Sequence, residues 1–159
     1  MRIDPNNFLL SLAAAMATSA GVELAGTPRG LWVHEAVEAS AAEVYTVMRI
    51  YGGAETASFA GHRRGSLAIQ RDTRGMDPQL VLAEATALHE TLLDDQDRPR
   101  MHWSLAGKRF AADGSIEADP DGRWIVRQVR LAGLPGIVGR DEAGRWMASA
   151  NMDVEFDRD

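Results

Sequence analysis

Four histidines are the first residues to consider for metal binding or acid–base chemistry, because imidazole changes its charge near neutral pH. No two of them stand four residues apart, and none belongs to an H-x-x-x-H or H-E-x-x-H pattern. A zinc site needs three or four converging ligands, and the chain has no cysteine to supply one. We therefore expect no metal and no cofactor, and we interpret the histidines as surface or capping residues. They are His34, His62, His89 and His102.

An acidic run at Asp94, Asp95 and Asp97 has the alternating oxygen ligands with which a calcium loop begins. Such a loop also needs a glycine at its sixth position and a glutamate at its twelfth. Here the sixth position is not glycine, and Leu105 stands at the twelfth. The run is better interpreted as the solvated end of a helix.

The serines and the spaced glycines do not form a catalytic or phosphate-binding motif. Ser66, Ser104 and Ser149 all lack the G-x-S-x-G pattern of a nucleophile elbow. Glycines 133, 136 and 139 are spaced by three residues, but Pro135 interrupts them and no helix follows. A phosphate-binding loop should lead into a helix, so this segment is predicted to be a turn.

The acidic pair Asp141–Glu142 stands between Arg140 and Arg145, in a stretch whose glycines predict a hairpin tip. A general acid–base pair should lie in a shielded cleft rather than on an exposed turn. The sequence therefore predicts no catalytic residue. We expect that the protein is not an enzyme and acts through its surface.

The net charge of the chain argues against a protein that binds nucleic acid. The net charge is −6, whereas a protein that wraps nucleic acid needs a basic surplus. An acidic wall suits DNA that must slide past without sticking, although from charge alone solubility is the better explanation. His62-Arg63-Arg64, and Arg71 with Arg74, are local basic clusters without interleaved aromatic residues. Contacts to an acidic partner subunit explain these clusters as well as nucleic acid does.

Tryptophan is favoured both in cores and at the energetic centres of interfaces. One of the four, Trp146, stands beside the predicted hairpin tip, so we expect it to contact a neighbouring molecule. Core packing is almost as good an interpretation. The others are Trp32, Trp103 and Trp124.

Two helices are predicted, at residues 5–20 and 78–94. Each begins with an aspartate followed by proline, Asp4-Pro5 and Asp77-Pro78, which is a typical N-cap and first helical position. Apolar residues recur at helical spacing in both segments. The first helix lacks the clearly positive flank of a signal peptide and is too short to span a bilayer.

The 159 residues fit a single domain. Between the strands we expect a flexible loop at about 54–65 and an inserted loop at about 106–122. Strands grouped with two helices predict an α+β fold, with a mostly antiparallel or mixed β-sheet and both helices packed on one face. The strands are predicted at 31–37, 44–51, 66–72, 124–131 and 145–156, with a weak one at 101–105.

Three pieces of the chain resemble a known family in their order and spacing. The first is a strand that ends in Tyr51-Gly52-Gly53, and the second is the strand 67–71 followed by the helix 80–92. The third is Gly139-Arg-Asp-Glu-Ala-Gly-Arg145, followed by Ser149-Ala-Asn151. Together they resemble the tail terminators of long-tailed bacteriophages, which are also called minor capsid or head–tail joining proteins.

The resemblance implies a structural virion protein, made in the cytoplasm of the bacterial host. It would form a hexameric ring that caps the tail tube, ends tube growth and joins the tail to the head. Its partners would be further copies of itself, the tail-tube protein and the head-side connector or stopper protein. DNA would pass through the lumen without specific binding, and no membrane would be involved. The residues expected at the interfaces are Arg140, Asp141, Glu142, Arg145, Trp146, His62, Arg63 and Arg64.

Two other functions stay open from the sequence. One is another ring protein of the phage neck or tail, such as a head-completion, stopper or tail-tube protein. The more distant one is a small cytosolic ligand-binding or hydrolase domain, which a deep pocket with converging polar groups would support.

Overall fold

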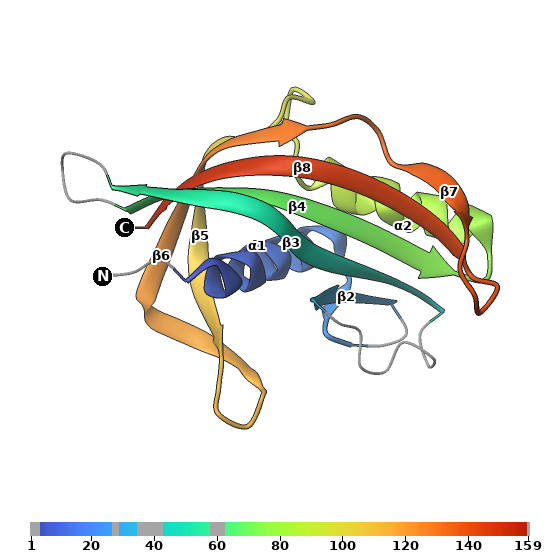
Figure 1. The fold of residues 1–159 in the computed structure, drawn as a ribbon, viewed down its shortest axis with the longest axis horizontal. Coiled ribbons are helices and arrows are strands. Elements are labelled where there is room, and N and C mark those ends of the chain that lie inside the picture. Colours follow the sequence, from blue (N-terminus) through green and yellow to red (C-terminus); the bar gives the residue numbers. More distant parts are fainter. Residues whose placement is uncertain (1–3, 27–28, 35–42, 58–62, 159) are drawn as a thin grey trace.

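An eight-stranded mixed sheet curves around two helices (Figure 1) in the computed structural model, which describes residues 4–26, 29–34, 43–57 and 63–158. The α+β fold predicted from the sequence is confirmed. The helices are α1 (Pro5–Ala20) and α2 (Pro78–Glu90). The strands are β1 (Glu23–Leu24), β2 (Arg29–Val33), β3 (Val44–Ala57), β4 (Arg63–Gly75), β5 (Met101–Phe110), β6 (Ile116–Leu131), β7 (Gly136–Arg140) and β8 (Trp146–Arg158).

The strand order is β1-β2-β3-β4-β8-β6-β5, and β7 also pairs with β8. The pairs β1–β2 and β2–β3 are parallel, and the other pairs are antiparallel. β8 pairs with β4 over its whole length on one edge. On its other edge it pairs first with β7 and then with β6. β8 therefore joins most of the sheet, and it ends the described chain.

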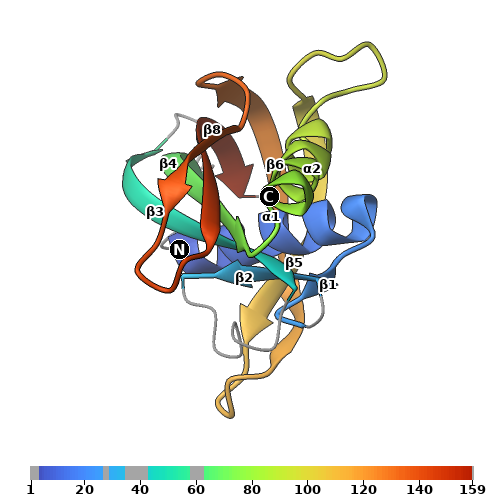
Figure 2. The same cartoon turned by 90° about the vertical axis from the view of Figure 1, so that its right-hand side faces the viewer.

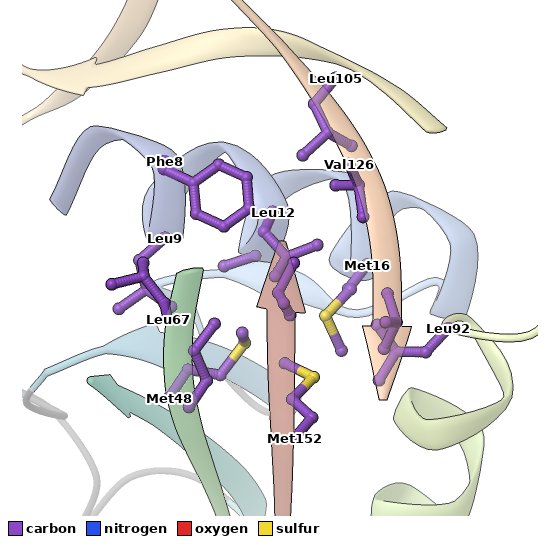
Figure 3. Packing of buried hydrophobic residues seen from close by; sticks show 14 of the residues in the cluster. Phe8, Leu9, Leu12, Met16, Met48, Leu67, Leu92, Leu105, Val126 and Met152 are labelled. Atoms are coloured by element: carbon purple, nitrogen blue, oxygen red, sulfur yellow. The ribbon is translucent and has the colours of Figure 1, made fainter. Parts of the chain in front are cut away.

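Helix α1 has the predicted bounds. The Asp4 carboxylate accepts a hydrogen bond from the backbone N–H of Asn6 at 2.9 Å, and Gly21 ends the helix at φ 68°. This left-handed conformation is one that glycine adopts without strain. Phe8, Leu9 and Met16 are completely buried, and they point into the core beneath the sheet (Figure 3).

An aromatic cluster lies at the start of α1, where the helix meets the middle of β6 and the end of β8. The rings of Phe8 and Phe156 stack with centroids 3.7 Å apart, and the ring of Trp124 meets both edge-on at 5.5 and 5.6 Å. All three side chains are buried. Such pairs contribute about 0.5–1.5 kcal/mol beyond their area burial.

Both helices pack on the same face of the sheet, as predicted, because the buried residues of β4 and β8 alternate toward them. Helix α2 begins at Pro78, also as predicted, but it ends at Glu90 rather than near residue 94. The Thr91 hydroxyl donates to the Leu88 carbonyl oxygen at 2.6 Å. Leu93 then forms a β-bridge with Pro99, so the chain reverses direction where a longer helix would continue.

The predicted flexible loop at 54–65 is wrong over most of its length. Strand β3 continues to Ala57 and β4 begins at Arg63, and these two residues face each other in the ladder. Residues 58–62 lie outside the described part of the chain, as do residues 35–37 of the first predicted strand. Small polar residues can extend a hairpin because the ladder satisfies backbone groups whatever the side chains are.

The predicted inserted loop at 106–122 is also wrong, because β5 and β6 form a bent hairpin there. Phe110 pairs with Ile116 across its end. The bend lies where the register shifts beside Gly107, at which a Cβ atom would stand 2.1 Å from the Gly122 carbonyl oxygen. This close backbone approach requires glycine. We call residues 107–122 the arm, because they project from the body of the protein (Figures 1 and 2).

The strands predicted at 124–131 and 145–156 are confirmed within β6 and β8, and both extend further than predicted. The strand predicted at 66–72 lies within β4, and the weak one at 101–105 lies within β5. Among the described residues, no helix is long and apolar enough to cross a membrane.

Candidate assembly surface

The predicted interface residues from Arg140 to Trp146 form the end of the hairpin that β7 makes with β8. Arg140 and Trp146 are its last cross-strand pair. The Asp141 N–H then donates to the Arg145 carbonyl oxygen at 2.8 Å, and Gly144 takes the turn position at φ 79°. The hairpin tip predicted from the sequence is therefore confirmed. We call residues 141–145 the tip.

Asp141 organises the tip. Its Oδ1 accepts hydrogen bonds from the backbone N–H groups of Ala143 and Arg145, at 3.0 and 2.9 Å. Its Oδ2 accepts from the side chain of Arg145 at 2.9 Å and from that of Arg74 on β4 at 3.3 Å. The backbone hydrogen bond from Arg145 is the main reason that the pKa of Asp141 lies below its usual value. The Asp141 carboxylate thus stabilises the conformation of the tip through hydrogen bonds within the same chain.

Trp146 is half-buried and packs against a small cluster beneath α2, formed by Val44, Val81, Ala85 and Ala148. The guanidinium of Arg140 lies 4.2 Å from the centroid of its ring, which is cation–π geometry. Core packing thus accounts for part of this tryptophan's surface. Its contact with a neighbouring molecule stays a prediction.

The two groups of predicted interface residues lie far apart. His62 is outside the described residues, and Arg63 begins β4. Arg64 pairs with Asp157 at 3.2 Å, near the end of the β4–β8 ladder that is opposite the tip. Glu142 is exposed on the tip itself. If all of these residues contact partners, the contacts involve at least two separate surfaces.

The outer face of the sheet carries a row of paired charges that the sequence analysis did not find. Arg49 pairs with Asp72 at 3.1 Å, and the Asp72 carboxylate also accepts a hydrogen bond from the Ser149 hydroxyl at 2.9 Å. Asp157 binds both Arg64 and Arg127. The sequence of β8 does indicate a polar outer face, because polar residues alternate with buried ones. The alternation in one strand does not identify the charged partners, because these come from other strands.

Arg71 and His89 form a buried polar pair beneath α2, and neither is the surface residue that the sequence analysis expected. Arg71 is 3 % exposed, and its Nη2 lies 3.2 Å from Nδ1 of His89. Burial lowers the pKa of Arg71 to about 10. Burial first, and then the nearby charge of Arg71, lowers the pKa of His89. Arg71 and Arg74 point to opposite faces because strand residues alternate.

Three hollows of the described surface involve β5, and one of about 570 Å³ lies at the bend of the arm between β5 and β6. Another, of about 420 Å³, is lined by residues from Asp94 to Ser104 and contains Arg100, whose guanidinium lies 4.6 Å from the Trp103 ring centroid. A third, of about 310 Å³, lies between α1 and β5. Within the described part of the chain, no three His, Asp or Glu side chains gather as they would around a metal ion.

The sequence matches no protein-family model and no curated protein. The geometry of the tip, the outer face and the arm therefore carries the functional argument.

Proposed function

We propose that the protein is a structural component of the virion of a long-tailed bacteriophage. In this proposal a hexameric ring of the chain caps the tail tube, ends its growth and joins the tail to the head. The tail-tube protein lies on one side of the ring and the head-side connector on the other. DNA passes through the central hole.

The tip is the observation that carries the proposal. The Gly-Arg-Asp-Glu-Ala-Gly-Arg segment is the most specific part of the resemblance, and its Asp141 and Arg145 bind each other within a projecting hairpin. Asp141 joins the turn to Arg145 and to Arg74 of the neighbouring strand. A preorganised projection loses little conformational freedom when it docks, which suits an assembly contact.

The outer face of the sheet supports the same proposal. Its arginines Arg49, Arg64 and Arg127 each pair with a carboxylate of the same chain. Arginines held in this way are less available to phosphates, and the whole chain carries a net charge of −6. Such a wall repels DNA rather than retaining it.

Electron microscopy of particles assembled with and without the gene tests the proposal. Without the protein, we expect overlong tails that are detached from filled heads. Supplying the protein from a plasmid should restore tails of normal length. Tails of normal length beside heads that leak DNA would point instead to a stopper protein, and the absence of tubes would point to a tail-tube protein. Normal particles would overturn the proposal entirely.

A further inference from the structure

The open edge of β7 is the first of two features that point to a specific contact. β7 pairs with β8 on one side, and no described strand pairs with its other side. Near this edge Leu134, Ile137 and Val138 are 83 %, 38 % and 64 % exposed. An exposed strand edge with apolar side chains is a template for strand addition.

The arm is the second feature. β6 pairs with β8 only from Trp124 onward, so the outer edge of its segment 116–119 has no described strand partner. At the base of the arm, the Arg158 side chain donates to the Asp121 carbonyl oxygen at 3.5 Å. On the other side of the arm, the Lys108 N–H already donates to the Ser11 hydroxyl at 2.8 Å. Toward the end of the arm, the polar contacts among the described residues are internal, such as that of Arg109 with Glu117 at 2.7 Å. A two-stranded ribbon is marginally stable by itself, so partner contacts would stabilise the arm.

The charges of the two features are complementary. The arm carries two cations, and its four acidic residues outnumber them; these are Asp113, Glu117, Asp119 and Asp121. At the end of β7, Arg140 stacks on Trp146 and makes no ion pair with any residue that the structure describes. Phe110 is 45 % exposed and stands across from Ile116. The arm thus offers apolar and acidic groups to a strand whose exposed side chains are apolar, with Arg140 at its end.

In Figure 1 the arm projects below the body of the protein, whereas β7 lies at the right-hand side above it, so one chain does not join its own arm to its own β7. A contact between two different surfaces of identical chains is heterologous, and it propagates until it closes a ring or forms a filament.

We propose that the outer edge of β6 in the arm, at residues 116–119, adds as a strand to the free edge of β7 in a second copy of the chain. Phe110 and Ile116 then cover Ile137 and Val138 of that copy, and Glu117 approaches Arg140. Pro120 ends the pairing because it has no N–H to donate. The inference deepens the proposed function, on which it rests for the assembly of copies into a ring. It assigns the surfaces that join them.

Cysteine cross-linking tests this contact cleanly, because the natural chain has no cysteine. In the full-length double variant Ala118→Cys/Val138→Cys, mild oxidation should give a ladder of covalent oligomers that ends at the size of the ring. A mixture of the two single variants should give heterodimers and no ladder, since each copy then carries only half of the contact. The control pair Ala118→Cys/Asp153→Cys, with the second cysteine on the exposed outer face of β8, should give no ladder.

A second variant keeps the outcome independent of oxidation. Val138→Asp places a charge on a side chain that is already 64 % exposed, so the fold should persist. Its self-association, measured by native mass spectrometry across a concentration series, should weaken roughly tenfold or more. The exposed substitution Asp153→Ala should leave self-association unchanged.

The inference and the proposed function can fail separately. If the double variant forms oligomers but no cross-link joins positions 118 and 138, or if self-association is indifferent to Val138→Asp, the inference is overturned and the ring stays possible. A natural chain that stays monomeric at all concentrations also overturns it, because the contact needs no other partner. A ladder from a protein whose gene can be deleted without effect on particles supports the inference and overturns the phage function.

Discussion

The tip and the end of the arm are two hairpin turns with the same backbone. Residue 111 donates its N–H to the carbonyl oxygen of residue 115 at 2.8 Å, and residue 141 donates to that of residue 145 at 2.8 Å. The fourth position of each turn is a glycine in the left-handed region, Gly114 at φ 85° and Gly144 at φ 79°. The two turns differ in where their aspartate stands and in what surrounds it.

In the arm the aspartate is the third residue of the turn, and the Asp113 carboxylate binds only Ser115. In the tip it is the first residue, and Asp141 reaches across the turn and also binds Arg74 of β4. Local sequence is therefore enough to shape a turn, but it does not anchor it. Arg74 of the neighbouring strand anchors the tip to the sheet, whereas the end of the arm has no such contact among the described residues.

A third turn supports this reading. After α2, the Asp94 carboxylate accepts hydrogen bonds from the N–H groups of Gln96 and Arg98, and the Arg98 side chain also binds it, at 3.3 Å. Aspartate first and arginine fifth is the same arrangement as in the tip. Here Asp97 takes the left-handed position at φ 57°. The acidic run that resembled a calcium loop is thus a turn whose first aspartate is hydrogen-bonded to other residues of the same turn.

The largest expected effect compares the aromatic cluster of the core, which lies beside the base of the arm, with the end of the arm. Phe156→Ala removes a buried ring that stacks on Phe8, and it should cost about 3–5 kcal/mol of unfolding free energy. Phe110→Ala, near the end of the arm, should cost less than about 0.5 kcal/mol in the isolated chain, because exposed substitutions have small effects. Urea unfolding of both variants measures this difference. Equal losses would mean that the end of the arm is packed as firmly as its base.

Removing the two turn aspartates tests the anchoring of the tip. Asp141→Ala should lower the melting temperature clearly more than Asp113→Ala, because it also breaks the link to Arg74. Asp141→Asn, which keeps one acceptor oxygen, should fall between them. Thermal unfolding at pH 7 measures all three variants. If Asp113→Ala lowered the melting temperature as much as Asp141→Ala, the distinction between the two hairpins would be contradicted.

Substitutions at the two turn glycines should show whether each hairpin opens locally or only when the whole protein unfolds. A Cβ atom added at Gly114 or Gly144 meets nothing within 4 Å. Alanine at either site should therefore lower the free energy of unfolding only through the strain of its left-handed backbone conformation, by about 1 kcal/mol. For Gly144→Ala this cost should appear in global unfolding. For Gly114→Ala it should appear mainly as faster amide hydrogen exchange in the arm, since the arm opens by itself. Hydrogen exchange that is unchanged in the arm variant would argue against independent opening.

The smallest effect concerns the half of the sheet that α2 covers. The pKa of His89 in the folded protein is lowered from its usual value of 6.5, so the unfolded chain binds the proton more readily. Neutral His89 therefore contributes fully to the free energy of unfolding above about pH 6.5. This contribution is lost as the pH falls toward the pKa of His89 in the folded protein. Urea unfolding from pH 7.5 to 5 should show a modest decline, and His89→Gln should flatten it. A natural chain with no decline over this range would contradict the effect.

Particular residues show what the sequence could predict. Asp4 and Gly21 bound α1 as expected, because caps act through neighbouring backbone groups. The arm was predicted as a loop because its acidic, glycine-containing strands bury little and show no clear alternation. The Arg71–His89 pair was also missed, since a basic residue on a strand can face either side. Only the packing of α2 shows which side is buried.

By itself, the sequence determined the helix starts, the final strand and the hairpin turn at the tip, because these follow from caps, alternation and glycines over a few residues. The segment of spaced glycines, predicted to be a turn, instead contains strand β7. Only the tertiary structure decided which hairpin is anchored, which charges pair across the sheet, and that β7 and the arm each keep an open edge. These outcomes depend on residues distant in the chain, such as Arg74 and Asp141. No local pattern specifies such a pairing, because it exists only after the strands have found their order.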